Sequence, residues 1–536
     1  MATNAAWTRA SRDGNGSIQP PGPIRKCLFS LQMLTPRDEP EFEGPPRTTA
    51  AGFPSQLEGS NPRKPPMTFA PIRAPADLGM GVVKTPKTVA NWNGVVQFHP
   101  REVVRPMSEE QLVTAIKDST QVRLVGGGHS MNAGFAADVN TTLVDMTGLD
   151  AVGKVQTESD GSHSVWAEGG ATLKKLGTEL AKQGYALEVL PTSADVTVGG
   201  STANGAHGSN LKGPASMSQQ MTGMQLIKSS GEKVTLSQAD PDFPLVRTAL
   251  GSLGAAYKVK FKVVPDFRLR STETWVDKSI LHPENLRAAL AQHDHAFFMY
   301  SPGDSKVMVR YLDKVPNDGS KDAGAKVKKD YAKTGLFERV VDHEGTKLVS
   351  HLPYHSKLRG ALDHVLEHTF RARKPSVGES RFMYQENIDH PSHDMSYAVP
   401  FDQTWNAIAA VEKQFKDLGY EQHVPFFIRF LKGDTAAGLG MNRGGDRTMI
   451  EFASTVEFHD QAAPQKKFED AMIALGGRPH WGKEFSVNPE AQYPAADWKR
   501  FGELAQQWGS KFQNKWSQTM SPAATPPVPF QRDSFG

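Results

Sequence analysis

The sequence contains a single cysteine, Cys27, among its 536 residues. One thiol excludes an internal disulfide and any CxxC zinc or redox motif, so the chain suits a reducing compartment or is indifferent to redox state. The formal net charge is only +3 and no dense Lys/Arg tract occurs, which argues against nucleic acid as a partner. Because no apolar run approaches the roughly 20 residues that cross a bilayer, we expect no transmembrane segment.

The N-terminal region also lacks the apolar core of a secretory signal, so a cytoplasmic location is the default expectation. An organelle address stays open as the alternative, because four basic side chains are opposed only by Asp13 over Met1–Lys26. Proline interrupts the chain repeatedly up to Thr88, and little periodicity is visible there. We therefore expect a disordered leader over residues 1–88, and a disordered tail over residues 521–536.

Helix and strand patterns alternate over the rest of the chain. Residues 89–266 contain a helix capped by Ser108, the strand QVRLV, a helix closed by Gly184 and a last strand, YKVKFKVVP. Residues 267–475 again mix helices, such as TWNAIAAVEKQFKDLGY, with strands, such as FFIRFLK and TMIEFAS. This pattern predicts an α+β fold class with two domains.

Glycine is concentrated directly after the strand QVRLV. Gly126, Gly127 and Gly128 are followed there by His129 and Ser130, in the motif GGGHS. Glycines permit a sharp turn or a close approach to another group. The motif lacks the lysine of a phosphate-binding P-loop and the spacing of a dinucleotide fingerprint. Taken alone, it leaves open both a nucleotide-binding loop and a turn with a packed histidine.

A second glycine cluster changes that balance. The stretch VTVGGSTANGAHGSN runs from Val196 to Asn210, and a third glycine element, LGSLGA, begins at Leu250. Glycines at such positions let backbone amides approach a bulky anion, as a pyrophosphate requires. The clusters together therefore indicate one extended ligand.

In chain order, the motifs NWNG, LVGGGHS, VGGSTANGAHGS, LGSLGA and GGRPHWGK resemble those of the vanillyl-alcohol-oxidase type of flavoproteins, and within it the aldonolactone and alditol oxidase group. The resemblance spans about Asn91 to Thr519, and the pair GGGHS and HWGK is its most specific part. It implies a two-lobed PCMH-type FAD-binding domain over residues 89–266. An inserted α+β cap domain over residues 267–475 would bind substrate, and residues 476–520 would return to complete the flavin site.

The resemblance implies FAD as the cofactor, covalently attached through His129 to the flavin 8α-methyl group. This linkage is chemically reasonable, because an imidazole nitrogen can add to that electrophilic carbon, and it would anchor the cofactor and raise its redox potential. His207 more simply supports its loop. The cofactor contacts that the resemblance implies are Gly126, Gly127, Gly128, His129, Ser130, Met131, Pro191, Thr192, Thr197, Gly200, Ser201, Gly205, His207, Gly254, Ala256 and Asn514.

By the same resemblance, Arg429 and Lys483 match the family's pocket cations, which would stand beside the reacting oxygen. An arginine within an apolar strand is costly to bury without a partner, so a polar cavity there is plausible; a surface-facing Arg429 is the alternative. The sequence also departs from the family, because Phe427 replaces a usual glutamate and Ala453 a threonine. Both changes argue against assuming a polyol substrate. We hypothesise that Glu451 restores the carboxylate.

The implied activity is oxidation of a CH–OH group of a polyol, sugar lactone or related alcohol by hydride transfer to flavin N5. In relatives the position of Pro191 helps decide whether O2 reaches the flavin, and a proline there favours an oxidase that releases H2O2; alternatively, Pro191 only shapes a turn. Two other interpretations stay open, a dehydrogenase that uses a quinone or cytochrome and a flavin-binding protein without catalysis. The pairs His293/His295 and His351/His355 are interpreted as solvated, so we expect no metal site.

Overall fold

The computed structural model describes residues 81–83, 88–316, 375–385, 392–420, 422, 424–455 and 461–519. The leader over residues 1–80 and 84–87, the tail from residue 520, and His351 and His355 lie outside these residues. Gly81–Val83 falls within the leader that we expect to be disordered, yet it forms a strand. Among the described residues, no helix is long and apolar enough to span a bilayer.

A four-stranded sheet begins the first lobe, the part of the chain up to residue 265. Its strands are β1 (Gly81–Val83), β4 (Glu102–Arg105), β5 (Val122–Val125) and β6 (Thr142–Asp145). Their order is β1-β4-β6-β5, and β6 pairs in parallel with both β4 and β5. A short hairpin of β2 (Val89–Ala90) and β3 (Gln97–Phe98) precedes β4.

The helix α1 (Glu109–Asp118) connects β4 to β5 and agrees with the predicted capped helix. The Ser108 side chain accepts a hydrogen bond from the backbone N–H of Gln111, which satisfies one of the free donors at the helix start. Leu112 and Ile116 lie one turn apart and are both fully buried. They pack against Val122 of β5, so the apolar stripe read from the sequence holds the helix on the sheet.

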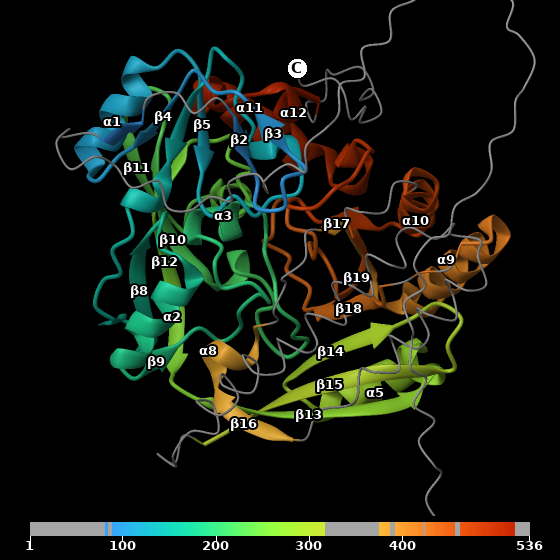
Figure 1. Ribbon diagram of the computed structural model, residues 1–536. Helices are drawn as coiled ribbons and strands as arrows, with labels where there is room; N and C mark the ends of the chain where they lie inside the picture. Colours follow the sequence, from blue (N-terminus) through green and yellow to red (C-terminus); the bar gives the residue numbers. More distant parts are fainter. Residues whose placement is uncertain are drawn as a thin grey trace, which may run out of the picture. The chain divides into compact units, whose positions relative to one another are not determined.

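A second, antiparallel sheet completes the first lobe (Figure 1). Its strands are β7 (Gln156–Thr157), β8 (His163–Glu168), β9 (Tyr185–Ala186), β10 (Met221–Ile227), β11 (Lys233–Ser237) and β12 (Ala255–Pro265). They run in the order β11-β10-β12-β8-β7, with β9 paired to β12. The helices of this part are α2 (Leu173–Lys182), α3 (Val198–Ala203) and α4 (Phe243–Val246). Gly184, predicted to close a helix, follows α2 with φ +79°.

The second lobe is built on an eight-stranded antiparallel sheet. Its strands are β13 (Arg268–Asp277), β14 (His295–Tyr300), β15 (Lys306–Val315), β16 (Ser376–Glu379), β17 (Ser392–Pro400), β18 (Phe426–Leu431), β19 (Arg447–Thr455) and β20 (Arg478–Pro479). They run in the order β16-β13-β15-β14-β18-β19-β17-β20. The associated helices are α5 (Pro283–Gln292), α8 (Ser380–Met383), α9 (Thr404–Leu418) and α10 (Ala462–Ala474). The mixed α and β fold class predicted from the sequence is confirmed.

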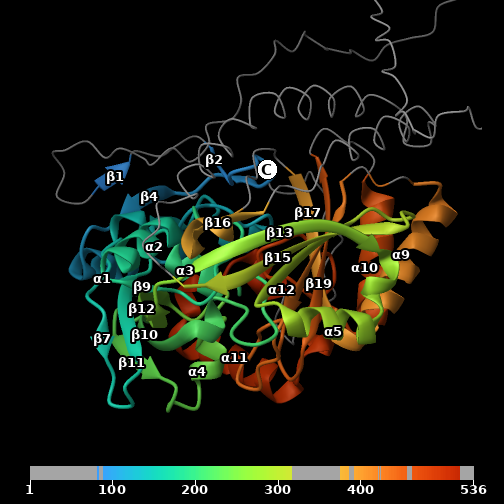
Figure 2. The same ribbon diagram turned by 90° about the horizontal axis from the view of Figure 1, so that it is seen from below.

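The two faces of this sheet differ in chemistry because side chains alternate along each strand. One face carries aromatic residues such as Phe298, Phe426 and Phe452, which form a buried cluster with residues of α5, α9 and α10. Figure 2 shows these three helices gathered beside the strands. The opposite face carries Arg429 and Glu451, at the alternate positions.

The C-terminal segment returns to the first lobe. It contains α11 (Ala495–Trp508), a 3₁₀ turn (Ser510–Phe512) and α12 (Lys515–Thr519). Phe512 is fully buried in the cluster that includes Leu112 and Val122. The Lys511 Nζ donates to the backbone oxygens of Ile116 and Lys117, at 3.0 and 2.8 Å. The segment around residues 511–512 is therefore tied to α1 and to the core of the first sheet.

Candidate active site

The loop after β5 packs directly on the start of α3, so the two glycine clusters of the sequence meet. A Cβ added to Gly126 would lie 2.0 Å from the Oγ1 of Thr197, and one added to Gly127 would lie 2.7 Å from the carbonyl oxygen of Asp195. Gly128 has φ +65°, a conformation that side-chain-bearing residues rarely adopt. The motif GGGHS therefore needs glycine both for its turn and for this contact.

A cavity opens where the glycine clusters meet. The predicted cofactor contacts that line it are Gly126, Ser130, Thr197, Gly200, Gly254 and Ala256. The predicted contacts outside its lining are Gly127, Gly128, His129, Met131, Pro191, Thr192, Ser201, Gly205, His207 and Asn514. Lining residues that the sequence reasoning missed include Arg123, Asn132, Asn204, Leu250 and Trp516.

Arg123 gives the cavity a buried positive charge. Its side chain is 2% exposed and bonds to the backbone oxygens of Gly251 (3.2 Å), Gly134 and Phe512. The Nε atom has no partner, and no carboxylate pairs with the guanidinium among the described residues. Burial lowers the pKa of Arg123 to about 10, so the group remains charged at neutral pH. A buried cation without a counter-ion suits an anionic ligand, and the residues present therefore fit the pyrophosphate of FAD.

His129 precedes the lining residue Ser130 and is half-buried. Its ring stacks on Trp92 with 5.7 Å between the ring centroids. Burial lowers the pKa of His129, and the positive charge of Lys483 adds to this effect against the opposing influence of Asp195. At neutral pH the imidazole is therefore uncharged, which leaves a ring nitrogen with a free lone pair.

The motif HWGK packs against the same loop, although it follows far later in the chain. The backbone N–H of Met131 donates to the carbonyl oxygen of Gly482 at 2.9 Å. The Asn132 side chain donates to the carbonyl oxygens of Trp481 and Lys483, at 2.7 and 2.9 Å. The two most specific motifs of the sequence are therefore neighbours in space.

Four charged side chains lie buried together at the polar face of the eight-stranded sheet. We call this group, which consists of Arg429, Glu451, Lys483 and Asp394, the charged cluster. Arg429 Nη2 lies 2.6 Å from Glu451 Oε2, and Lys483 Nζ lies 2.6 Å from Asp394 Oδ2. Lys483 Nζ also lies 3.7 Å from Glu451 Oε2, and Ser396 Oγ donates to that same oxygen at 3.0 Å. Arg429, Glu451 and Asp394 are 8%, 8% and 3% exposed. The three predicted catalytic residues thus lie together, and the alternative of a surface-facing Arg429 is excluded.

Each group of the cluster has a pKa set by burial and by its neighbours. Burial alone would raise the pKa of Glu451, but the positive charges of Lys483 and Arg429 outweigh it and lower the value to about 2. Burial would lower the pKa of Lys483, but the carboxylates of Asp394 and Glu451 raise it. Burial raises the pKa of Asp394, against the lowering effect of Lys483. Glu451 and Lys483 are therefore charged at neutral pH.

The pairing of neighbouring strands accounts for the two positions, Phe427 and Ala453, at which the sequence departs from the family it resembles. Phe427 of β18 stands directly opposite Glu451 of β19, so a carboxylate absent from one strand is present at the facing position of the next. Ala453 of β19 stands opposite Asp394 of β17 in the same way. Asp394 was missed by sequence reasoning, and its only local signal is an acidic residue within the alternating strand SHDMSYAVP.

The prediction that His295 is solvated is wrong. We interpreted His293 and His295 as solvated, but His295 is 2% exposed, and both its ring nitrogens are bonded, to the Ser209 carbonyl oxygen (3.0 Å) and the Tyr384 hydroxyl (2.8 Å). Burial lowers its pKa to about 4. The alternation of β14 turns this residue inward, which the short spacing between the two histidines concealed. Among the described residues, no group of three or more potential metal ligands occurs.

Comparison with known proteins finds two matching families and several relatives. The FAD binding domain family matches residues 100–237, and the D-arabinono-1,4-lactone oxidase family matches residues 259–520. L-gulono-1,4-lactone dehydrogenase of Mycobacterium tuberculosis is 27% identical over 438 residues, which cover 77% of this chain and 94% of that protein. L-gulonolactone oxidase of Mus musculus is 25% identical over 426 residues, covering 76% and 91%.

Cholesterol oxidase of Brevibacterium sterolicum has a similar fold, with a TM-score of 0.64 at 15% sequence identity. The match covers 84% of this chain and 100% of that one. The first lobe therefore matches an FAD binding domain, and the second lobe carries the charged cluster. In sequence and in fold, the chain thus resembles the flavoproteins whose motifs its sequence shares. It is an FAD-dependent oxidoreductase that acts on CH–OH donors.

Proposed function

We propose that the protein oxidises a CH–OH group of an aldonolactone or a closely related sugar alcohol and passes the electrons to O2, giving H2O2. The observation that carries this proposal is the charged cluster of Arg429, Lys483, Glu451 and Asp394, held beside the loop that bears His129. Sugar lactones carry several hydroxyl groups, and buried charged groups bind hydroxyls well. The relatives named for gulonolactone and arabinonolactone support this substrate class.

FAD, when bound, accepts the hydride from the substrate carbon. In this proposal Arg429 and Lys483 stand at the substrate oxygen and stabilise the negative charge that develops as its proton leaves. Glu451 bonds to Arg429 and lies near Lys483, so it holds both cations in place. Arg429 and Lys483 are thus catalytic residues, whereas Glu451 acts by positioning them.

The first lobe would hold the cofactor through backbone and charge. We assign the diphosphate to the glycine-lined part of the cavity, where Arg123 supplies the positive charge. The sixteen contacts expected from the sequence remain proposals, and those lining the cavity, such as Gly126 and Thr197, have the strongest support.

We also propose that His129 carries the flavin covalently. The support is an uncharged, half-buried imidazole next to the lining residue Ser130. The test is acid precipitation of the purified protein, followed by the flavin absorbance of pellet and supernatant. We expect the colour to stay with the wild-type pellet and to leave it in His129→Ala, with the exposed His99→Ala as a matched control. Colour released from the wild type would overturn the covalent link but not FAD binding.

Activity is tested by mixing the FAD-loaded protein with L-gulono-1,4-lactone or D-arabinono-1,4-lactone under argon and then admitting air. We expect the flavin absorbance to bleach with a lactone and to recover in air, with one H2O2 formed per lactone oxidised. Slow recovery in air with fast recovery on adding a quinone would favour the dehydrogenase alternative. A flavin that no lactone bleaches would favour a binding protein without catalysis.

A further inference from the structure

Two buried histidines beside the charged cluster have opposite and well-defined hydrogen-bonding roles. His207 is 2% exposed, and its Nδ1 lies 2.9 Å from the carbonyl oxygen of Gly208. A carbonyl oxygen only accepts, so Nδ1 carries the proton and Nε2 is left as an acceptor. That Nε2 atom is buried and has no hydrogen-bond partner among the described residues. An unpaired buried acceptor is costly and calls for a ligand group that donates to it.

His480 has the complementary arrangement. Its Nδ1 accepts a hydrogen bond from the backbone N–H of Gly482 at 2.9 Å. Nδ1 is therefore unprotonated, and the proton of the neutral ring sits on Nε2, which becomes a donor. Within the part of the chain that the structure describes, no group accepts from this Nε2–H. His480 is 9% exposed as a residue, and its Nε2 is not fully shielded, so a ligand can reach this donor.

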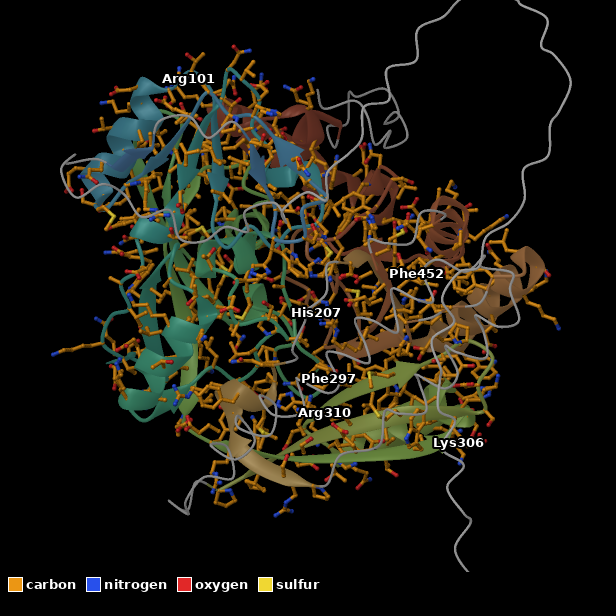
Figure 3. The ribbon with its side chains drawn as sticks, in the orientation of Figure 1. Arg101, His207, Phe297, Lys306, Arg310 and Phe452 are labelled. Carbon is orange, nitrogen blue, oxygen red and sulfur yellow. The ribbon has the colours of Figure 1, made fainter. Side chains whose placement is uncertain are left out.

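The two rings are close to one another and to the proposed reaction site. Their centroids are 5.3 Å apart and their planes are tilted by 47°. A Cβ added to Gly482 would lie 3.3 Å from His480 Cε1 and 3.6 Å from Asn204 Cβ, and Asn204 lines the cofactor cavity. Figure 3 labels His207 where the first lobe adjoins the strands of the second, and the backbone N–H of Asn210 donates to the Phe430 carbonyl oxygen of β18 at 2.7 Å.

The cations Arg429 and Lys483 favour the neutral form of the two imidazole rings. Among the described residues, Glu451 is the one charged group near them that opposes this effect. Burial lowers the pKa of His207 well below its usual value, and the charge of Arg429 lowers it further. Burial lowers the pKa of His480 to about 3, with Lys483 and Arg429 adding to the effect against Glu451. Both rings therefore keep one donor and one acceptor over the whole physiological pH range.

We propose that His207 and His480, the imidazole pair, bind one hydroxyl group of the substrate, which donates to His207 Nε2 and accepts from His480 Nε2–H. The inference rests on the proposed function and deepens it, since it names the groups that select the substrate. A hydroxyl is the group that both donates and accepts. A carbonyl oxygen accepts only, so a ketone at that position leaves His207 unpaired, and a deoxy analogue leaves both rings unpaired.

Two matched substitutions separate the proposed role from a structural one. Asparagine places an amide at the position of Nδ1, so His207→Asn keeps the bond to Gly208 and His480→Asn keeps the bond to Gly482, while each loses the ring tip. Glutamine reaches the position of Nε2 instead, so His207→Gln and His480→Gln keep a polar group at the tip. If the histidines act only through their bonds to the backbone, the asparagine variants keep activity and the glutamine variants lose it. If they bind a substrate hydroxyl, the glutamine variants keep the selectivity for that hydroxyl and the asparagine variants lose it.

The measurement is kcat/KM for a 1,4-lactone and for its analogues deoxygenated at one carbon at a time, with the FAD-loaded enzyme. In the wild type we expect one hydroxyl whose loss lowers kcat/KM by about 10- to 100-fold. In the asparagine variants we expect removal of the same hydroxyl to change kcat/KM by no more than about threefold. In the glutamine variants we expect the wild-type effect of that removal to be largely retained. Flavin content and the flavin spectrum stay the same in all four, which excludes a defect in the cofactor site.

The outcomes separate this inference from the proposed function. Wild-type turnover with unchanged discrimination in the asparagine variants overturns the imidazole pair and leaves the function standing. Absence of turnover with any lactone overturns the proposed function, and the pair is then judged without substrate by NMR of ¹⁵N-histidine-labelled protein, assigned through the two asparagine variants. Neutral rings protonated at Nδ1 in His207 and at Nε2 in His480 between pH 5 and 8 support the pair, whereas a charged ring or the reverse tautomer overturns it.

Discussion

Glu451 is the residue on which the arrangement of the two pocket cations depends. It lies 2.6 Å from Arg429 and 3.7 Å from Lys483, and it is 8% exposed. Glu451→Gln removes the negative charge that holds the two cations and leaves the Arg429 and Lys483 side chains themselves unchanged. We expect kcat/KM for a lactone to fall by at least about tenfold, or 1.4 kcal/mol of transition-state stabilisation. Unchanged turnover in steady-state assays would refute this positioning role, and Glu503→Gln, on the exposed side of α11, is the control.

The same substitution makes a prediction about stability and pH. The pKa of Glu451 is depressed to about 2, so its stabilising contribution is present above the unfolded value of about 4.3 and is lost as the pH falls toward 2. At pH 7 we expect Glu451→Gln to lower the free energy of unfolding by on the order of 3 kcal/mol, because a buried cation loses its partner. Urea unfolding at a series of pH values should show the difference between wild type and variant shrinking below pH 4. A difference independent of pH would contradict the ion pair.

At the residue scale, sequence reasoning identified Arg429, Lys483 and Glu451 but not Asp394. Arg429 and Lys483 stand within motifs, and an arginine in the apolar strand FFIRFLK is conspicuous by itself. Asp394 enters the site only because β17 pairs with β19, which places it opposite Ala453. The hydrogen-bonding roles of His207 Nε2 and His480 Nε2 could not be predicted from the sequence either. They follow from the bonds that each ring's Nδ1 makes to the backbone of a nearby glycine.

At the scale of elements, the register of β18 and β19 makes positions 427 and 451 exchangeable. Phe427 faces Glu451 directly, and Arg429 lies two residues along the same strand and on the same face. A carboxylate at either position therefore lies near the guanidinium. We expect Phe427→Glu to recover part of the kcat/KM lost in Glu451→Gln, whereas Phe427→Gln in the same background recovers none. Equal activity of the two double variants would show that the carboxylate does not act through Arg429.

The loop after β5 makes a second prediction at this scale. A Cβ on Gly126 would lie 2.0 Å from Thr197 Oγ1, at the start of α3, so Gly126→Ala must push these elements apart. We expect the purified variant to hold much less FAD than the wild type, measured as the ratio of flavin to protein absorbance. Gly502→Ala in α11 is the control, because a Cβ there meets nothing within 4 Å and alanine favours a helix. Normal FAD content in Gly126→Ala would contradict the placement of the cofactor in this cavity.

Elements were predictable where their signals are local. Ser108 caps α1, and Gly184 takes a left-handed conformation after α2, as their positions in the sequence suggested. The order of the eight-stranded sheet was not predictable, because β14 lies between β15 and β18, and β17 between β19 and β20. The pairings β14–β18, β17–β19 and β17–β20 join segments far apart in the chain and leave no periodic trace.

At the scale of the whole molecule, the last described segment closes the cavity that begins near residue 122. Phe512 is fully buried against the first lobe, and its carbonyl oxygen accepts a hydrogen bond from Arg123. Asn514 donates to the carbonyl oxygens of Ala133 and Ala136 at 3.1 and 3.0 Å, and Trp516 lines the cavity. The cavity proposed for FAD is therefore lined by residues of β5 and of the C-terminal segment, such as Arg123 and Trp516.

Truncation tests this closure. A chain ending at Gly509 loses Phe512, Asn514 and Trp516 and opens the cavity to water, whereas a chain ending at Thr519 keeps every described contact. We expect the shorter chain to lose FAD on gel filtration and the longer one to keep it. Because the shorter chain also loses buried apolar surface, Arg123→Met in the full chain provides the independent arm: it should weaken FAD retention with little change in the secondary structure measured by circular dichroism. Full FAD retention by Arg123→Met would place the cofactor's negative charge away from Arg123. Full FAD retention by the shorter chain would show that the C-terminal segment is not part of the FAD site.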